Sequence, residues 1–542
     1  MIVRGNILNV FTDEIYPGEI NIENGIIQSI KEVDQYFNDI IVPGFIDSHI
    51  HIESSMVTPS RFSEVALRHG TTGVVCDPHE IANVIGMEGI EYMVNDSRNA
   101  PLKFYFTAPP CVPSTKFEDN GASISVDDVD FLLKRDEFVG LSEVMDYNAL
   151  INDDEDLVKK IELAKKYNKN IDGHAPLLSG FPLQKYIKYG VTTDHECFTK
   201  AEALEKKRLG MKIMIREGSE SHMLEELINV GADFIVTDDI KPEDLVRGHL
   251  NVLLRKAVDL GMDPFDAIKM VTINPAEYYN LNCGSISPGK SADLVFIDNL
   301  NDFRVKRVII NGNTFLKKQK VLYRAKPLPL ETTMNVQYKK ENDFNVKSSK
   351  NNSKSAIVNV IKVISDSIIT TLGSAKLTVD RNVVIPSVFE DVLKVSVIER
   401  YGGNTIANAF ISGFGIKNGA IASSITHDSH NIIVVGTNSN YMAEAVNKII
   451  KNGGGVVAIS NKEKLDIPLP IAGIMSDKSA YEIAKDCVEM NEMLDRMGCD
   501  LENPFATLSF MSLPVVPDVK ITNRGLFDVN SNKFIDVIRE EK

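Results

Sequence analysis

The stretch that decides the fold runs from Ile41 to Met56 and reads IVPGFIDSHIHIESSM. Its first apolar residues, Ile41 and Val42, predict the start of a strand, and the Pro43-Gly44 pair interrupts that strand. His49 and His51 share the parity of Phe45, so a strand would project these side chains to one face. Two imidazoles on one face can bind one metal ion, because histidine is the commonest metal ligand near neutral pH. A lone His-x-His pair is more often structural, so the metal hypothesis requires ligands on further strands.

Short apolar runs alternate with helical segments between residues 42 and 281, and this alternation is typical of a parallel sheet. Eight β/α units in about 240 residues favour a TIM barrel over an open doubly wound sheet. No Gly-x-Gly-x-x-Gly follows the first strand, so a dinucleotide site is not expected. The expected strands are Phe45–Glu53, Thr72–Asp77, Lys103–Ala108, Phe138–Met145, Asn170–His174, Val191–His195, Lys212–Glu217 and Phe234–Asp238.

Acids and histidines stand on or at the carboxyl ends of most of these strands, the edge at which such barrels build active sites. Four imidazoles and two carboxylates among them suit one or two divalent first-row ions. The acid on strand four stands among apolar neighbours, where a carboxylate is costly unless it is paired or metal-bound. The expected metal ligands are His49, His51, Glu143, His174, His195 and Asp238.

Three motifs resemble known families. The sequence PGFIDSHIH at Pro43–His51 resembles the first-strand signature of the amidohydrolase superfamily. Its continuation to Met56 is similar to the adenine deaminase family, and SPGKSADLV at Ser287–Val295 resembles the return strand of amidohydrolases. The resemblance implies an α/β protein with a TIM (β/α)8 barrel, a composite β-sandwich and a C-terminal α+β domain. The expected boundaries are 42–281 for the metal-dependent barrel, 1–41 with 282–325 for the sandwich, and 326–542 for the adenine deaminase-type domain.

The resemblance also implies a reaction, the hydrolytic deamination of adenine to hypoxanthine and ammonia in purine salvage and adenine catabolism. A metal-activated hydroxide would attack C6, and Asp238 would carry its proton toward the leaving amine. Asp239 is a rival for this role, although parity with Phe234 favours Asp238. Protonation of the purine ring requires a second acid, for which Glu80 and Glu217 are candidates. The expected cofactor is a pair of divalent ions, manganese or iron in preference to zinc.

Two other functions stay open at this point. In many amidohydrolases, including dihydroorotases and hydantoinases, strand four provides a carboxylated lysine that bridges two ions, whereas Glu143 stands in this chain. This difference counts against a hydrolase of cyclic amides, but it leaves open another ring substrate such as a different aminopurine. A non-catalytic barrel that serves as a scaffold is the alternative from another class. A missing ligand would favour the scaffold, and none is missing here.

Several further residues have both a functional and a structural interpretation. The acids and histidine directly after strand two could contact substrate, or they could cap the following helix. The polar stretch near residue 428 could reach a metal or an active site, or it could form a turn. The weaker candidates for substrate binding are Asp77, His79, Arg216 and Ser219, and those from the C-terminal segment are His427, Asp428 and His430. His69 is expected on the surface, and His249 has no evident partner.

The composition is ordinary for a globular protein, with 43% hydrophobic and 25% charged residues in a chain of 542. The formal net charge of −16 argues against nonspecific binding to nucleic acid or to an anionic membrane. Six scattered cysteines form no Cys-x-x-Cys pair, and no signal peptide or spanning segment is evident. We therefore expect a cytoplasmic location. The resemblance implies an enzyme that binds a small molecule, adenine, and the extra C-terminal domain favours a homo-oligomer, a dimer or larger.

Overall fold

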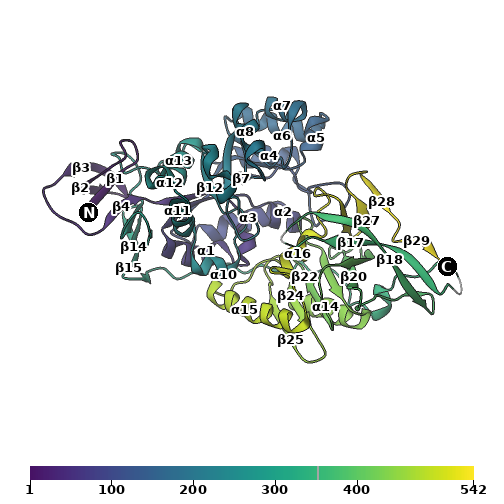
Figure 1. Ribbon diagram of the computed structural model, residues 1–542. Coiled ribbons are helices and arrows are strands. Elements are labelled where there is room, and N and C mark those ends of the chain that lie inside the picture. Colours follow the sequence, from purple (N-terminus) through teal and green to yellow (C-terminus); the bar gives the residue numbers. More distant parts are fainter. Residues whose placement is uncertain (351–352, 366, 542) are drawn as a thin grey trace. The chain divides into compact units, whose positions relative to one another are not determined.

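The computed structural model describes residues 1–350, 353–365 and 367–541, and these form two compact units. Unit 1 contains Met1–His79, Ile90–Cys111 and Ile124–Leu328, and unit 2 contains Glu80–Gly89, Val112–Ser123 and the described part of Pro329–Lys542. Among the described residues, no helix is both long and apolar enough to cross a membrane. Figure 1 follows the chain through both units by colour.

Eight parallel strands form the centre of unit 1. They follow one another in chain order, with β5 to β9 in one sheet and β10 to β12 in a second sheet. The described strands are β5 (Phe45–Ile50), β6 (Thr71–Cys76), β7 (Lys103–Ala108), β8 (Phe138–Val144), β9 (Asn170–Gly173), β10 (Thr193–Asp194), β11 (Lys212–Arg216) and β12 (Phe234–Val236). Seven of the eight strands lie within the segments that the sequence predicts, several of them shorter, and β6 begins one residue before its predicted segment, at Thr71.

Backbone hydrogen bonds join the two sheets at both of their junctions. The Thr192 N–H donates to the Ile171 carbonyl at 3.0 Å, which connects β9 to the segment that enters β10. At the other junction the Asp238 N–H donates to the His49 carbonyl (3.0 Å), and the His51 N–H donates to the Asp238 carbonyl (2.9 Å). The first and last strands are therefore hydrogen-bonded neighbours, and the fold is a TIM-barrel-like cylinder.

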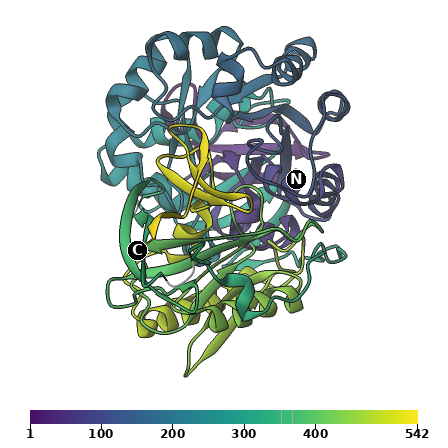
Figure 2. The same ribbon diagram turned by 90° about the vertical axis from the view of Figure 1, so that its right-hand side faces the viewer.

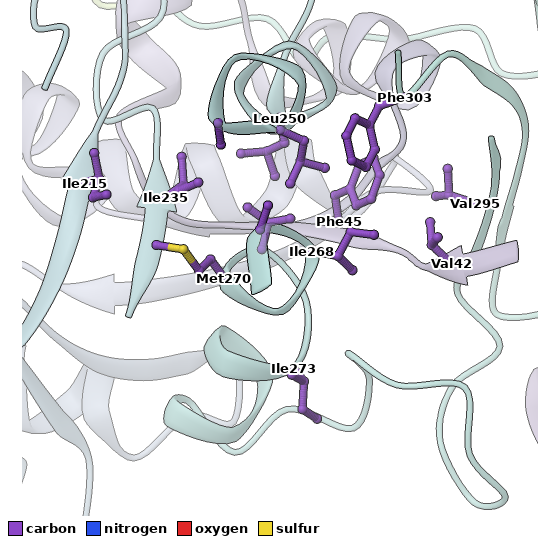
Figure 3. Packing of buried hydrophobic residues seen from close by; sticks show 14 of the residues in the cluster. Val42, Phe45, Ile215, Ile235, Leu250, Ile268, Met270, Ile273, Val295 and Phe303 are labelled. Atoms are coloured by element: carbon purple, nitrogen blue, oxygen red, sulfur yellow. The ribbon is translucent and has the colours of Figure 1, made fainter. Parts of the chain in front are cut away.

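Helices follow the strands along the chain, as the alternating sequence pattern predicts. In unit 1 they are α1 (Pro59–Ala66), the larger part of α3 (Met87–Ser97), α4 (Val126–Leu133), α5 (Tyr147–Ile151), α6 (Glu155–Lys166), α7 (Gly180–Lys188), α8 (Lys200–Arg208), α9 (Leu224–Leu227), α10 (Pro242–Arg247), α11 (Leu250–Asp259), α12 (Pro264–Met270) and α13 (Ile273–Tyr278). Figure 3 shows Leu250 and Ile268 from two of these helices packed with Ile235 and Phe45 of the barrel. This burial holds the strands, and hence their carboxyl ends, in fixed positions.

One antiparallel-rich sheet joins the segments before and after the barrel. Its strand order is β16-β15-β14-β13-β4-β1-β2-β3. The strands are β1 (Ile2–Asn9), β2 (Glu14–Glu23), β3 (Ile26–Glu32), β4 (Ile40–Pro43), β13 (Leu294–Ile297), β14 (Val305–Ile310), β15 (Asn313–Lys317) and β16 (Lys320–Val321). Ile41 packs into one apolar cluster and Val42 into another, as the two-residue period of a strand requires. The more specific expectation of a sandwich stays a prediction.

Unit 2 contains a ten-stranded sheet with the path β19-β18-β17-β21-β20-β23-β22-β24-β25, to which β29 adds along β17. Its strands are β17 (Ser355–Val363), β18 (Thr370–Asp380), β19 (Val383–Val384), β20 (Val392–Ile398), β21 (Ile406–Ser412), β22 (Ala420–Ser423), β23 (Ile432–Gly436), β24 (Gly455–Ile459), β25 (Lys464–Pro468) and β29 (Ile538–Glu541). Helix α14 (Ser439–Asn452) packs its buried face against β22, β23 and β24 (Figure 2, green). Other elements of this unit are α2 (His79–Ile85, from Glu80 on), α15 (Ala480–Met497), α16 (Pro504–Phe510), β26 (Val519–Thr522), β27 (Gly525–Asp528) and β28 (Lys533–Ile535).

Candidate metal centre

The six expected ligands converge at the carboxyl ends of the barrel strands. Asp238 follows β12, and its Oδ1 lies 3.1 Å from His49 Nε2 and 2.9 Å from His51 Nε2. Asp238 has a φ of 59°, in the left-handed region that a non-glycine residue rarely adopts. The backbone is held there by its two hydrogen bonds to β5 and the segment after it, which aim the carboxylate at both histidines.

Glu143 on β8 lies between two groups of imidazoles. Its Oε1 is 3.2 Å from His51 Nε2, whereas its Oε2 is 2.6 Å from His174 Nδ1 and 3.3 Å from His195 Nε2. Each oxygen therefore faces a different group of donors. A carboxylate placed in this way is suited to bridge two cations, the role that the resemblance to amidohydrolases implies for strand four.

The chemistry of the donor set fits divalent metal ions. The donor atoms within each of three overlapping groups lie within 4.8 Å of one another, and the groups are His51, Asp77, His79 and Glu143; His49, His195 and Asp238; and Glu143, His174 and His195. Among the atoms of the six expected ligands, four that are buried have no hydrogen-bond partner within the described residues, namely His49 Nε2, Glu143 Oε2, His174 Nδ1 and Asp238 Oδ1. Buried polar atoms normally have partners, and cations would provide them here.

Neighbouring groups orient the ligands. His51 Nδ1 lies 3.1 Å from the Asp77 carbonyl, and a proton donated along this contact leaves the Nε2 lone pair directed toward Glu143 and Asp238. The Asp77 carboxylate is occupied by His79, whose Nδ1 lies 3.0 Å from Oδ2. His79 is also 3.6 Å from Glu143 Oε1. The structure thus brings Asp77 and His79, both weaker candidates from the sequence, to the edge of the ligand set.

Arg216 of β11 pairs with three acids beside this group. Its Nε lies 2.6 Å from Asp238 Oδ2, its Nη2 lies 2.8 Å from Asp239 Oδ2, and its Nη1 pairs with Glu196. Burial raises the pKa of Asp238, but Arg216 and the neighbouring histidines hold it well below its usual range. Because Asp238 Oδ2 is paired with Arg216, Oδ1 is the oxygen that faces His49 and His51. The rival acid, Asp239, is held by Arg216 and by the Ser54 hydroxyl at 2.5 Å.

The carboxylates dominate the electrostatics of the cluster. Burial lowers the pKa of His195, but Glu143 and then Asp238 outweigh it and raise the pKa to about 9. The pKa of Glu143 is held well below its usual range because His174 and His195 outweigh its burial. Metal ligation requires neutral imidazoles, so binding of a cation here would release protons.

Two other candidates lie apart from the six ligands and have partners of their own. Glu217 pairs with Lys256, and its Oε2 accepts the Leu224 N–H at 2.8 Å. Ser219 donates its hydroxyl to Asp244 at 2.7 Å. Within the described residues, the hydrogen bonds and ion pairs of these two side chains include none of the six expected ligands.

The C-terminal candidates gather around Glu80 within unit 2. Glu80 Oε1 lies 2.7 Å from His427 Nδ1, and its other oxygen pairs with His430 Nε2. Burial raises the pKa of Glu80, but the two imidazoles outweigh it and hold the pKa well below its usual range. Asp428 is buried in the same turn, and burial together with Asp428 raises the pKa of Glu118 to about 8.

The structure corrects two expectations about histidines. His69, expected on the surface, is only 7% exposed, because the short 3-10 helix at Leu67–His69 packs inside unit 1. His249, for which no partner was evident, is fully buried with Nδ1 2.6 Å from the Thr71 hydroxyl and Nε2 3.1 Å from Asp47. In both cases the contacts come from distant parts of the chain, which local patterns do not reveal.

Comparisons with known proteins identify the family of the chain. The amidohydrolase family matches residues 40–315, and the adenine deaminase C-terminal domain matches residues 367–533. An adenine deaminase of Methanosphaera stadtmanae is 67% identical over 542 residues, all of both chains. One from Methanothermobacter thermautotrophicus is 46% identical over 97% of this chain and 98% of its own.

A crystal structure of an atrazine chlorohydrolase from Arthrobacter aurescens, complexed with zinc, is 14% identical. The match covers 60% of this chain and 96% of that chain, with a TM-score of 0.45. The family matches and the full-length relatives agree with each other along the chain. The chain therefore belongs to the adenine deaminase family, with an amidohydrolase domain followed by an adenine deaminase C-terminal domain.

Proposed function

We propose that this protein hydrolyses adenine to hypoxanthine and ammonia at the carboxyl end of its barrel. The observation that carries the proposal is the convergence of four histidines and two acids in a chain that is 67% identical, over its whole length, to a protein named adenine deaminase. The substrate is a small molecule, and the reaction consumes one water. A C–O bond forms at C6, the bond from C6 to the amino nitrogen breaks, and ammonia leaves.

The amidohydrolase family and the ligand set support a divalent metal centre. When bound, divalent ions supply Lewis-acid activation of water, which lowers the pKa of the water toward 7. We assign His49, His51, His174, His195, Glu143 and Asp238 as the ligands. The two oxygens of Glu143 face two groups of imidazoles, which favours two ions over one. Manganese or iron is our proposal for the metal.

Asp238 is the residue that we assign to proton transfer. Its Oδ2 is paired with Arg216, so its Oδ1 is the oxygen available to take a proton from the attacking water. The same oxygen can then donate that proton to the leaving amino group, which is general acid–base catalysis by one carboxylate. Arg216 acts through Asp238 as a positioning residue.

The acid that protonates the purine ring stays a choice between Glu80 and Glu217. Glu80 is held by two imidazoles, which can carry protons, whereas Glu217 is held by a lysine and a backbone N–H. The C-terminal candidates His427, Asp428 and His430 are proposed to act with Glu80. Asp77, His79 and Ser219 stay proposals for substrate binding.

Several broader predictions accompany the proposed reaction. We propose a role in purine salvage in the cytoplasm and assembly into a homo-oligomer. The three-part division at 1–41 with 282–325, 42–281 and 326–542 also stays a prediction. Another ring substrate is the second candidate function, because the ligand set is compatible with hydrolysis of other aminopurines.

The first experiment follows adenine by ultraviolet absorbance with chelator-treated protein, before and after addition of Mn²⁺, Fe²⁺ or Zn²⁺. We expect metal-dependent formation of hypoxanthine. If the protein turned over another aminopurine but not adenine, that aminopurine would replace adenine as the proposed substrate. Absence of turnover with any metal and any aminopurine would refute the deaminase function.

A pair of variants tests the assignment of Asp238. Asp238→Asn should lower kcat by at least about 100-fold, because an amide cannot accept the proton. Asp239→Asn is the matched control, and its effect on kcat should be much smaller. Metal content is measured in both variants to separate loss of the ion from loss of proton transfer. Equal effects of the two substitutions at equal metal content would contradict the assignment.

A further inference from the structure

Helix α8 of unit 1 contains a fully buried lysine. Lys206 is 0% exposed, although the helix is polar along most of its length. Lysine is almost never fully buried unless it is paired, because desolvation of an ammonium group is costly. The groups that pair with the Lys206 ammonium group therefore indicate what this buried charge does in the protein.

All three ammonium protons of Lys206 have acceptors. Nζ donates to the Ala175 carbonyl at 2.7 Å, to Glu202 Oε1 at 2.6 Å, and to Asp194. Burial lowers the pKa of Lys206, but Asp194 outweighs it and raises the pKa above its usual range. The lysine is therefore a permanent cation between two buried acids.

The two acids in turn hold two loops. Asp194 Oδ1 accepts the N–H groups of Ala175 at 3.2 Å and Glu196 at 3.0 Å. Glu202 accepts the N–H groups of Leu177 at 2.7 Å and Phe198 at 3.0 Å. One loop follows β9 and the other follows β10, and Lys206 connects the acids that hold both of them.

These loops carry two of the assigned ligands. His174 directly precedes Ala175, and His195 directly follows Asp194. Both imidazoles lie against the same oxygen of Glu143, at 2.6 and 3.3 Å. Strand β9 ends at Gly173 and β10 ends at Asp194, one residue before each histidine. The strands therefore do not include His174 or His195, and the loops position both side chains.

We propose that Lys206 is a positioning residue for the metal centre, whose ammonium group holds the His174 and His195 loops at the spacing that metal binding requires. The inference rests on the proposed metal-dependent function and adds a residue to it. Groups that orient ligands in this way typically change metal affinity by about 10- to 100-fold when they are removed.

Lys160 of α6 provides a matched control. It is also buried, pairs with an acid one turn earlier (Asp156, 2.7 Å), and donates to a backbone carbonyl, that of Pro110, at 3.0 Å. Pro110 lies in the loop after β7, which carries none of the assigned ligands. Loss of either lysine removes a buried cation, but only loss of Lys206 should affect ligand geometry.

The experiment compares Lys206→Met with Lys160→Met in the full chain. Metal is removed, folding is checked by near-ultraviolet circular dichroism, and Mn²⁺ affinity is measured by chelator competition. We expect about 10- to 100-fold weaker Mn²⁺ binding for Lys206→Met, and binding within about twofold of wild type for Lys160→Met. The visible spectrum of the Co²⁺-loaded protein should change only in Lys206→Met.

A double variant covers the case in which Lys206→Met does not fold. Asp194→Asn with Lys206→Met removes the charge of Asp194, the more deeply buried of the two acids that lose their cation, so folding should be regained while Mn²⁺ binding stays weak. Wild-type affinity in either folded protein, or equal losses in the Lys160→Met control, would overturn the proposal. A wild-type protein that binds metal without deaminating adenine would contradict the substrate alone, since the variant comparison would still decide the role of Lys206.

Discussion

Glu143 is the residue that contacts the most imidazoles of the proposed metal centre. It faces His51 with one oxygen and two other imidazoles with the second, and it is almost fully buried. A carboxylate in this position is stabilised only by positive charge, either protons on the imidazoles or metal ions. The sequence could predict this residue because an acid stands out on an apolar strand, although it could not predict which imidazole each oxygen would face.

The first prediction concerns Glu143→Gln. The amide keeps the shape of the side chain but removes the charge that binds cations, so metal content and deaminase activity should fall together. Metal is counted by atomic emission on protein dialysed against a fixed Mn²⁺ concentration, and turnover is measured on the same samples. Full metal content with full turnover would remove Glu143 from the site.

The second prediction uses the buried, neutral His69. Burial, with smaller contributions from His249 and Arg68, lowers its pKa from 6.5 to about 3. The unfolded chain therefore binds a proton below pH 6.5 that the folded chain does not bind until about pH 3. The folded state should lose stability as pH falls through this window, by about 1.4 kcal/mol per pH unit, or about 2 kcal/mol by pH 5.

His69→Gln removes this proton, so the variant should lose less stability than wild type between pH 7 and 5. Urea unfolding at the two pH values measures the difference. His222 is the control, because it is exposed and its pKa is raised, chiefly by Glu217. His222→Gln should not reduce the loss of folding stability between pH 7 and 5. A parallel decline of wild type and His69→Gln would contradict the pKa assigned to His69.

At the scale of elements, the positions of the strands could be predicted better than their ends. Short apolar runs that alternate with helical segments predicted the positions of all eight barrel strands, because these patterns are local. β5 ends at Ile50 and β12 at Val236, before the ligands His51 and Asp238, since the chain there bends to complete the site. Such bends depend on contacts between strands, for example the Asp47 carboxylate with the Thr237 N–H and hydroxyl, which no local pattern contains.

The third prediction tests this close packing of strand ends at Gly218, which follows β11. A Cβ at this position would lie 2.1 Å from the Thr237 carbonyl oxygen and 2.3 Å from that of Asp239, and backbone cannot move aside as a side chain can. Gly218→Ala should therefore shift the segment that carries Asp238 and lower kcat by at least about tenfold, since small misplacements of catalytic groups are costly.

Gly73→Ala is the matched control within the barrel. Its Cβ would meet the Tyr105 side chain at 3.5 Å, an ordinary van der Waals contact. This variant should keep wild-type kcat and metal content. Wild-type kcat in Gly218→Ala would show that the end of β11 can move without disturbing Asp238.

At the scale of the whole molecule, the chain order does not follow the division into units. Glu80–Gly89 and Val112–Ser123 belong to the unit that contains the C-terminal domain, although both lie within the span of the barrel sequence. The assignment of these two segments to unit 2 could not be predicted from the sequence. It depends on contacts between residues more than 300 positions apart in the chain, such as those of Glu80 with His427 and His430. Each unit has apolar clusters of its own, so each can unfold with its own transition.

The last prediction follows from the location of the six proposed ligands, all of which lie in unit 1. A metal ion that binds only the folded site should stabilise that unit by about 2.7 kcal/mol at a free concentration 100 times the Kd. Calorimetry with Mn²⁺ and with chelator should therefore show one transition that shifts and one that does not. Lys160→Met identifies the transition of unit 1, because it removes a buried cation from that unit alone. Equal shifts of both transitions would mean that the two units unfold together, whereas a shift confined to the other transition would place the metal outside the barrel.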